Sequence, residues 1–304
     1  MAGAGSSPQQ VEIGGHRLRL TNLDKVLYPR DGTTKAEVVR WYADAAPALA
    51  PYAQLRPVTR KRWPDGVAAA SFFEKNLPAG TPDWVERVTL PHTERDITYP
   101  LIPADATGAL ATLVWFAQSG ALELHVPQWQ VSDGVPQPPD RIVIDLDPGP
   151  GAGLDECGSV ALDIRARMAA DGLHAVPVTS GSKGMQLYAA VSGSTIEGAS
   201  TEIASEYVKQ LAQSLTKERP DDVVWRMTKD LRPGKVFVDW SQNNGRKTTI
   251  APWSLRGRDH AFVATPRTWD EVEDGGMTHL TIPQARERLA DPDPLAALRG
   301  AGRS

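Results

Sequence analysis

The sequence has 304 residues, 41% of them hydrophobic and 23% charged, with a formal net charge of −4. These values are ordinary for a globular protein and exclude a uniformly basic nucleic-acid coat. No apolar run approaches the roughly 18 residues of a membrane span, and residues 1–10 lack the apolar core of a secretory signal, so we expect a disordered tail there. The single cysteine, Cys157, excludes an internal disulfide and fits a reducing cytosol.

The first part of the chain predicts a hairpin, a long helix and several short strands. Apolar residues alternate on both sides of Gly14-Gly15 and predict a hairpin over residues 11–20. Thr34 and Glu37 have the spacing of a capping box, and the helix that they begin is expected to end around Pro47 and Pro51. Beyond it we expect strands at 57–62, 70–74, 87–90, 98–102 and 122–126, a helix at 109–118, and a proline-rich connector at 136–139.

The second part has the pattern of a sheet that is covered by helices. We expect strands at 141–146, 175–179, 185–191 and 236–240, and helices at 155–170 and 201–217. The order β-α-β-β-α-β over residues 141–240 is typical of a sheet with helices on one face. On the second helix, Ile203, Tyr207, Leu211 and Leu215 are expected to face the core.

Two aspartates follow the apolar run of the strand at 141–146. Because side chains on a strand alternate, Asp145 and Asp147 share one face, opposite the isoleucines of the same run. Neighbouring carboxylates repel each other unless a cation lies between them, and a divalent metal prefers oxygen ligands. Asp239 ends a similar run, Lys235–Trp240, and is a candidate third ligand on the open face of the sheet. The alternative is that these aspartates only form turns or cap helices.

Positive charge and hydroxyl groups are the second chemical signal. The loop Ser180–Gly184 offers backbone N–H groups, two serine hydroxyls and the Lys183 ammonium to an anion such as phosphate, although its spacing is not that of a Walker A loop and turn geometry alone is the alternative. Eight basic residues stand against two acidic ones from Arg226 to Arg258, and Arg60–Arg62 forms a second cluster. These clusters favour a polyanionic partner, a solvated charged face being the alternative. A metal site beside a phosphate cradle indicates phosphoryl transfer.

Aromatic side chains offer a third signal. Phe72 and Phe73 fall on opposite faces of a short strand, so one is expected in the core and the other is available to stack on a base; the alternative is that both are buried. His125 lies on a strand and is either a structural hydrogen-bonding residue or a participant in chemistry.

Six motifs stand in order along the chain: Thr59–Pro64, Phe72–Lys75, His125–Trp129, Asp145–Gly149, Thr179–Gly184 and Val238–Asn243. Together they resemble the bacterial primase-polymerase family of the archaeo-eukaryotic primase superfamily. That family includes the polymerase domain of the end-joining ATP-dependent DNA ligase D and stand-alone mycobacterial repair proteins. The resemblance covers about residues 21–258 and implies an α+β primase-polymerase fold, in which an RRM-like catalytic sheet with helices on one face packs against an N-terminal mixed α/β module.

The resemblance also implies roles for matching residues. Asp145, Asp147 and Asp239 would be the catalytic acids and would hold two divalent metal ions, Mn²⁺ or Mg²⁺. The incoming nucleotide would contact Lys61, Phe73, His125, Ser180, Ser182, Lys183, Gln242 and Arg256. DNA would contact Asn22, Lys25 and Lys35 around a 5′-phosphate, Phe72, and Arg232 in a loop at the templating end. The helix that begins at Lys35 would itself favour phosphate at its N-terminus.

The function implied by this resemblance is template-directed nucleotidyl transfer. Such a DNA-directed polymerase or primase-polymerase fills short gaps that carry a 5′-phosphate, in excision repair or non-homologous end joining, and prefers ribonucleotides. Its expected partners are gapped or nicked DNA, NTPs or dNTPs, a DNA ligase and an end-binding protein, without a membrane; we expect a cytoplasmic, nucleoid-associated monomer. The alternatives are a metal-dependent phosphodiesterase or nuclease acting on DNA ends, which uses the same carboxylates, and a silent module that binds DNA ends.

We expect four segments along the chain. They are the tail at 1–10, an N-terminal module at 11–135 that contacts the 5′-phosphate and template, a catalytic module at 136–265, and a helical, acidic tail at 266–304 that packs on the core. Residues 102–115 are slightly longer than in the ligase-domain pattern and predict a loop that affects the bridging of DNA ends. The sequence leaves open whether the chain is a stand-alone protein or a ligase domain, and whether it primes de novo.

Overall fold

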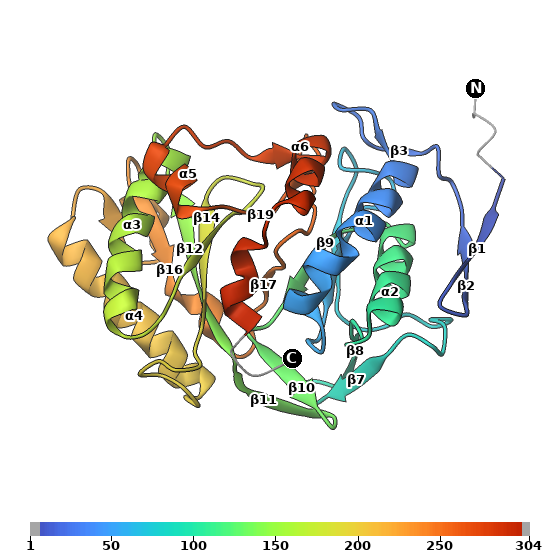
Figure 1. Ribbon diagram of the computed structural model, residues 1–304, viewed down its shortest axis with the longest axis horizontal. Coiled ribbons are helices and arrows are strands. Elements are labelled where there is room, and N and C mark those ends of the chain that lie inside the picture. Colours follow the sequence, from blue (N-terminus) through green and yellow to red (C-terminus); the bar gives the residue numbers. More distant parts are fainter. Residues whose placement is uncertain (1–6, 300–304) are drawn as a thin grey trace.

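Two β-sheets, each covered by helices, form the frame of the protein (Figure 1). The computed structural model describes residues 7–299. The larger sheet has six strands, in the order β15 (Val223–Val224), β16 (Val236–Asp239), β12 (Arg141–Pro148), β14 (Met185–Ala190), β13 (Val176–Thr179) and β19 (Thr265–Pro266). The smaller sheet has four, in the order β17 (Thr249–Ile250), β9 (Ala121–Val126), β5 (Thr59–Arg62) and β6 (Phe72–Glu74).

One face of the larger sheet is buried under two helices. Ile142, Ile144 and Leu146 of β12 lie in one apolar core with α3 (Leu154–Ala170) and α4 (Thr201–Glu218). The expected sheet with helices on one face is therefore confirmed. Because strand side chains alternate, the same packing turns Asp145 and Asp147 to the opposite face, where they line a pocket together with His125 of β9.

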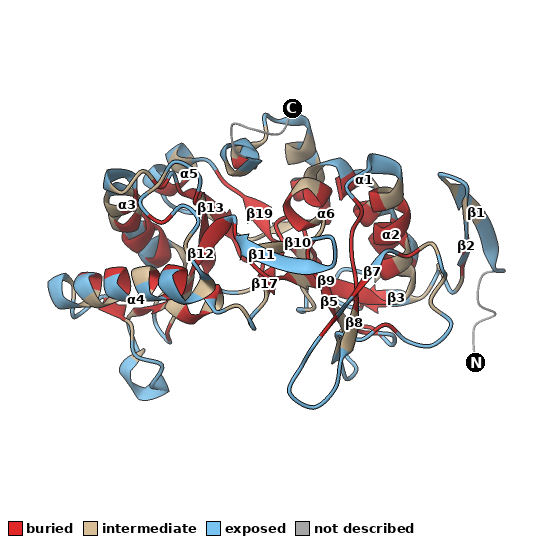
Figure 2. Cartoon of the chain, turned by 90° about the horizontal axis from the view of Figure 1, so that it is seen from below, coloured by how far each residue is buried: buried red, intermediate tan, exposed pale blue. Residues whose placement is uncertain are grey.

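The smaller sheet is covered by α1 (Lys35–Ala53) and α2 (Ala106–Gln118), and Figure 2 shows the buried side of both helices. Trp41, Leu49 and Phe116 are completely buried in this half. The predicted capping box of α1 is confirmed, since the Glu37 N–H donates to Thr34 Oγ1 and the Thr34 N–H donates to the Glu37 carboxylate. Its two hydrogen bonds explain why the helix begins at Lys35.

The predicted end of the first helix is nearly correct, whereas two other predictions in these segments are wrong. α1 includes Pro47 and Pro51 and ends at Ala53, two residues after Pro51, and its last turn buries Tyr52 in a core with Val143 and Val178 of the larger sheet. The loop expected at 102–115 is mostly α2, which packs on α1 in the core. On α4, Ile203 is 55% exposed, because the apolar stripe that faces the sheet is displaced to Ala204 and Val208.

Four short hairpins in the described part of the chain lie outside the two main sheets. They are β1 (Gln9–Ile13) with β2 (His16–Leu20), β3 (Val26–Tyr28) with β4 (Thr33–Thr34), β7 (Arg87–Leu90) with β8 (Ile97–Pro100), and β10 (Trp129–Ser132) with β11 (Val135–Pro139). A further two-stranded sheet pairs β18 (Phe262–Val263) with β20 (Leu280–Thr281), which are separated in the chain by β19 and a helix. The first hairpin confirms the predicted hairpin over Gly14-Gly15, but Gln9 and Gln10 belong to it, so the expected tail at 1–10 is too long. Its residues 1–6 lie outside the described residues.

The expected connector at 136–139 is an edge strand. Trp129 pairs with Pro139 and Ser132 with Val135, and Figure 2 shows β11 exposed along the side of the molecule. Prolines are tolerated there because an edge strand leaves the N–H positions of one side unpaired. The junction between the two halves is therefore a paired ribbon and not a loop.

The chain crosses between the two halves more than once. β17 pairs with β9 in the smaller sheet, and residues from Ala251 to Val263 join the N-terminal core, so the part expected as one catalytic module at 136–265 is divided. After β19, α5 (Trp269–Asp274) packs on α3, whereas α6 (Ile282–Glu287) packs on α1. Short 3₁₀ turns complete the fold: η1 (Lys229–Leu231), η2 (Trp240–Asn243), η3 (Arg288–Ala290) and η4 (Pro294–Arg299). Within residues 7–299, every helix is too short or too polar to span a bilayer.

Candidate functional site

The three predicted acids meet on adjacent strands of the larger sheet. In the antiparallel register of β12 and β16, Asp145 pairs with Asp239, and Asp147 follows two residues along on the same face. Burial raises the pKa of Asp145, and the charges of Asp147 and Asp239 raise it further. Burial and Asp239 likewise raise the pKa of Asp147. The prediction that these carboxylates come together is borne out by the strand register.

Asp239 also has a local structural task. Its carboxylate caps η2, accepting hydrogen bonds from the Ser241 N–H at 3.0 Å, the Ser241 hydroxyl at 2.5 Å and Gln242 Nε2 at 2.9 Å. The Lys247 ammonium in turn donates to the Ser241 hydroxyl. The capping alternative considered from the sequence therefore holds for Asp239, in addition to its place beside Asp145.

The donor chemistry of this cluster can be tested against a divalent metal. In the described part of the chain, no three acidic, imidazole or thiol side chains already form a ready-made metal centre. The carboxylates of Asp145 and Asp147 nevertheless share a buried face without an ion-paired partner of their own at salt-bridge distance among the described residues. Oxygen donors with mutual repulsion suit a hard cation, so the residues fit such an ion once the Asp239 carboxylate turns from its cap.

A pocket of about 310 Å³ opens beside the acids and gathers most of the predicted nucleotide contacts. It is lined by Asp145, Asp147, His125, Ser180, Ser182, Lys183, Gln242 and Arg256, together with Gln186, Thr248, Thr249, Ile250 and Arg258, which the sequence did not single out. Gln186 pairs with Asp145 across the sheet and belongs to the same face. The pocket thus places cationic and hydroxyl groups opposite a group of carboxylates.

The loop between β13 and β14 forms one wall of this pocket. The Ser180 N–H donates to the Gly184 carbonyl at 2.9 Å, which closes the turn, and Gly181 adopts a left-handed φ of 67°. A Cβ on Gly184 would lie only 1.8 Å from the Leu146 carbonyl oxygen, so the loop sits directly against the end of β12. Glycine is required at this contact, and it brings the Lys183 side chain to the pocket beside the aspartates.

A buried glutamate that the sequence did not identify organises the opposite wall. Glu123 accepts a hydrogen bond from His125 Nε2 at 2.8 Å and another from the Gly257 N–H at 3.0 Å, and Arg256 Nε lies 3.6 Å from its carboxylate. Although burial raises the pKa of Glu123, His125, Arg256 and the Gly257 N–H lower it to about 2. Burial lowers the pKa of His125 against the opposing effect of Glu123. Glu123 therefore fixes two pocket residues.

The exposed aromatic pair lies next to this pocket. Phe72 is 45% and Phe73 59% exposed, so the expectation that one of them is core is wrong; β6 is a three-residue edge strand that no helix covers. The Phe73 ring meets the His125 ring edge-on at 5.7 Å, and the Lys61 ammonium lies 5.2 Å from the Phe73 ring centre. The two predicted contacts Lys61 and Phe73 thus border the nucleotide pocket.

The predicted phosphate pocket at the start of α1 is a cluster of cations. The Lys35 side chain is largely buried, and burial, Lys25 and Arg62 lower its pKa to about 8. The Lys25 ammonium is 2.6 Å from Asp65, and Asn22 adopts a left-handed φ of 52° at the turn that precedes it. The structure brings these three predicted residues together at one corner of the N-terminal half.

The expectation that free N–H groups at the N-terminus of α1 bind the phosphate is wrong. The N–H groups of Lys35 and Ala36 donate to the carbonyls of Lys25 and Leu23, and that of Glu37 donates to Thr34. These first-turn groups are already satisfied within the protein and do not await an anion. Binding of a phosphate here must depend on side-chain cations and on the helix dipole.

Arg232 lies closer to the acids than the sequence indicated. Its guanidinium stacks 3.8 Å above the Phe237 ring, and Phe237 pairs with Asp147 across the sheet. The positive charge of Arg232 opposes the increase in the Asp147 pKa. A Cβ on Gly149 would lie 1.9 Å from the Arg232 carbonyl oxygen, so the η1 loop packs tightly on the end of β12.

Comparison with known proteins places this geometry in context. The sequence pattern of the family described as "LigD, primase-polymerase domain" matches residues 34–295. The multifunctional non-homologous end joining protein LigD of Mycolicibacterium smegmatis is 48% identical over 281 residues, 92% of this chain and 36% of that protein. The bifunctional LigD protein of Bacillus subtilis is 30% identical over 257 residues, 84% of this chain and 40% of that protein.

A solved structure supports the same comparison. The polymerase domain of Mycobacterium tuberculosis ligase D, in complex with DNA, superposes with a TM-score of 0.87 at 46% identity, over 93% of this chain and 98% of that chain. The primase-polymerase fold expected from the sequence is therefore confirmed. The chain spans little more than a third of the mycobacterial LigD proteins that it matches.

Proposed function

This chain belongs to the family of LigD primase-polymerase domains, and from that premise we propose that it transfers nucleotides to DNA strand ends under the direction of a template. The proposed substrates are NTPs or dNTPs and short gaps that carry a 5′-phosphate. The relatives are end-joining proteins, and we propose that this chain fills gaps during the joining of breaks, with a DNA ligase and an end-binding protein as partners. The preference for ribonucleotides is part of the proposal on the family resemblance alone.

The main support for nucleotidyl transfer is the combination of acidic and cationic residues in one site. Asp145 and Asp147 line one pocket together with Ser180, Ser182 and Lys183 of the Ser180–Gly184 loop. Asp239 pairs with Asp145 on the adjacent strand. A nuclease would account for the acids but has no need of a cradle for a free triphosphate beside them. The combination of both walls supports nucleotidyl transfer more strongly than hydrolysis.

The acids are the proposed ligands of two Mg²⁺ or Mn²⁺ ions. Bound by Asp145, Asp147 and Asp239, such ions would acidify a primer 3′-hydroxyl and neutralise the triphosphate. To hold such an ion, the Asp239 carboxylate would give up its hydrogen bonds with Ser241 and Gln242, and the Gln242 amide, which lines the pocket, would become available to the nucleotide. This exchange gives Gln242 its role in the pocket.

The remaining pocket residues bind and orient the nucleotide. Lys183 and the hydroxyls of Ser180 and Ser182 hold triphosphate oxygens through charge and hydrogen bonds. Glu123 holds His125 and Arg256 in place, so that Arg256 donates toward the nucleotide without reorganising. The His125 ring gives its Nε2–H to Glu123, and because burial lowers its pKa it offers the nucleotide the Nδ1 atom as an acceptor. The exposed Phe73 ring stacks on a base, and the nearby Lys61 ammonium adds positive charge on the same side.

The test is extension of labelled gapped DNA by the complete chain with nucleotides and Mn²⁺. The proposal expects strands to lengthen, whereas a nuclease shortens them. Asp145→Ala and Asp239→Ala should each abolish extension and leave DNA binding intact, while Glu202→Ala, which removes an exposed acid from α4, should extend normally. Shortened strands, or extension retained in both aspartate variants, would refute the assignment.

A further inference from the structure

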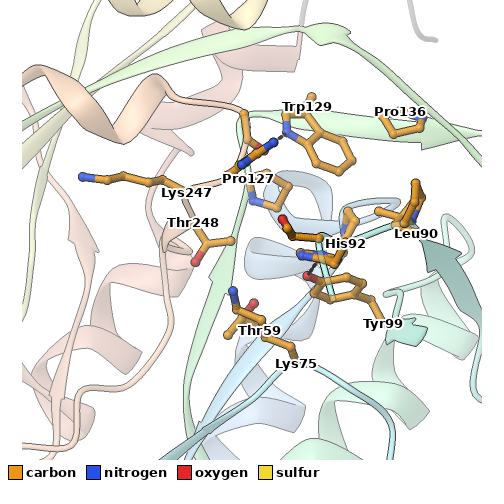
Figure 3. Close-up of a pocket in the computed structure, with 15 residues that line it drawn as sticks. Thr59, Lys75, Leu90, His92, Tyr99, Pro127, Trp129, Pro136, Lys247 and Thr248 are labelled. Atoms are coloured by element: carbon orange, nitrogen blue, oxygen red, sulfur yellow. Dashed lines mark hydrogen bonds between the residues drawn. The ribbon is translucent and has the colours of Figure 1, made fainter. Parts of the chain in front are cut away.

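A second pocket, of about 390 Å³, lies on the N-terminal side of the catalytic pocket. This volume is within the range of about 300–1,000 Å³ that small-molecule sites occupy. Its apolar walls come from Leu90, Pro127 and Pro136, and its aromatic groups are Trp129, Tyr99 and His92 (Figure 3). None of the roles assigned above uses this pocket.

The aromatic walls are held firmly in place. Figure 3 shows Trp129 on one side of the pocket and the pair His92 and Tyr99 on the other. Trp129 Nε1 donates to the Gly245 carbonyl at 3.0 Å, and the ring packs against the small core formed by β7 and β8. Tyr99 is buried, and its hydroxyl is hydrogen-bonded to His92 Nε2 at 2.7 Å. A flat apolar ligand would meet preformed surfaces here.

The charged residues that line this pocket are all basic. Lys75, Arg246 and Lys247 line it, all three exposed, and none of its fifteen lining residues in the described structure is acidic. Aromatic surfaces combined with cations are the features that bind single-stranded nucleic acid, because bases stack while phosphates contact the basic groups. A purely apolar ligand would not need the cations, and a small anion would not need the aromatic walls.

The second pocket adjoins the first at the start of β17. Thr248 lines both, and Thr59 of the second pocket pairs across the sheet with His125 of the first. We propose that this pocket holds an unpaired nucleotide of a single-stranded DNA tail, with its base between Trp129 and the His92–Tyr99 pair and its phosphates near Lys75 and Arg246. This inference rests on the proposed function, which brings DNA to the adjoining pocket.

The experiment measures the contribution of a tail to binding. Kd values are obtained by fluorescence anisotropy for one duplex with a 3′ tail, with a 5′ tail and without a tail. In the wild-type protein one tail should tighten binding roughly 5- to 100-fold, and its polarity identifies the strand. This gain in affinity on adding the tail is called the tail increment. Trp129→Leu should lose the tail increment, and Trp129→Phe should keep most of it. Trp84→Leu, which removes a tryptophan that stacks on His16 on the far hairpin, should keep all of it.

A spectroscopic measurement locates the bound base. A 2-aminopurine placed at successive tail positions should be quenched at one position only, and Trp129→Leu should restore its fluorescence. The double charge reversal Lys75→Glu and Arg246→Glu changes only exposed side chains and should remove the increment even if Trp129→Leu fails to fold.

The outcomes separate this proposal from the previous one. Equal tail increments in the wild-type protein, Trp129→Leu and the double charge reversal would refute the proposal that the pocket binds the tail. Uniform quenching of 2-aminopurine at every tail position would refute it as well. These are binding measurements and remain readable if the protein extends no primer. Normal extension without a tail increment would refute the pocket alone, whereas a tail increment without extension would refute the proposed polymerase activity.

Discussion

Binding of a 5′-phosphate at the start of α1 should weaken as the pH rises from 7 to 9. Burial, Lys25 and Arg62 lower the pKa of Lys35 from 10.5 to about 8. Lys35 is then about nine-tenths protonated at pH 7 and about one-tenth protonated at pH 9. A phosphate monoester, with a pKa near 6, stays doubly charged across this window and favours the protonated lysine. Affinity that depends on this charge should therefore fall about tenfold.

The assay compares two DNAs that differ only in the 5′-phosphate. Kd is measured by fluorescence anisotropy at pH 7, 8 and 9 for a one-nucleotide gap with and without the phosphate, and the ratio of the two removes general effects of pH on DNA binding. The ratio should fall about tenfold for the wild-type protein. Lys35→Arg keeps its charge throughout and should give a ratio that does not change with pH.

Two results would contradict this reasoning. A wild-type ratio that is constant from pH 7 to 9 would show that Lys35 does not carry the phosphate contact. An equal decline in Lys35→Arg would assign the titration to another group. Lys25 and Arg62 already form ion pairs, with Asp65 at 2.6 Å and with Glu74 at 2.8 Å, so Lys35 is the cation of the three without a carboxylate at ion-pair distance among the described residues.

Three further predictions follow from the site. Glu123→Gln should lower the free energy of unfolding at pH 7 by about 3 kcal/mol, measured by urea denaturation, because folding lowers the pKa of Glu123 from 4.5 to about 2. In the wild-type protein this contribution is present above pH 4.5 and is lost as the pH falls toward 2. Mn²⁺ should raise the Tm of the wild-type protein and not that of Asp145→Ala, by thermal shift against an EDTA control. Gly184→Ala should reduce both Tm and extension, because its Cβ would overlap the Leu146 carbonyl; a wild-type Tm would show that the loop is not packed on β12.

The acid cluster could be predicted because its causes are local. The two-residue period of a strand places Asp145 and Asp147 on one face wherever β12 lies, and only the pairing with Asp239 depends on the sheet. The capping box at Thr34 and the hairpin over Gly14-Gly15 are equally local. Such features follow from neighbouring residues alone, which is why these predictions agree with the structure.

The failures involve contacts between distant parts of the chain. Nothing near Phe72 and Phe73 indicates that β6 ends a sheet and has no helix over it, so a buried face was expected. Nothing in the sequence around Pro51 indicates that α1 continues past it and that its final turn packs against the larger sheet. The importance of Glu123 depends on Arg256, more than a hundred residues away, and no pattern around either residue shows it.

The path of the chain explains why both halves are needed for the site. The carboxylates come from the larger sheet, whereas His125 lies on β9 of the smaller one. β17 and the segment after it return from the second half to the first, and this return carries Arg256 to Glu123. A catalytic half cut out at residues 136–265 would retain its acids but would lose the partner strand of β17 and the carboxylate that orients Arg256. The nucleotide pocket is therefore a property of the junction, and the N-terminal half supplies part of its chemistry as well as its contacts with DNA.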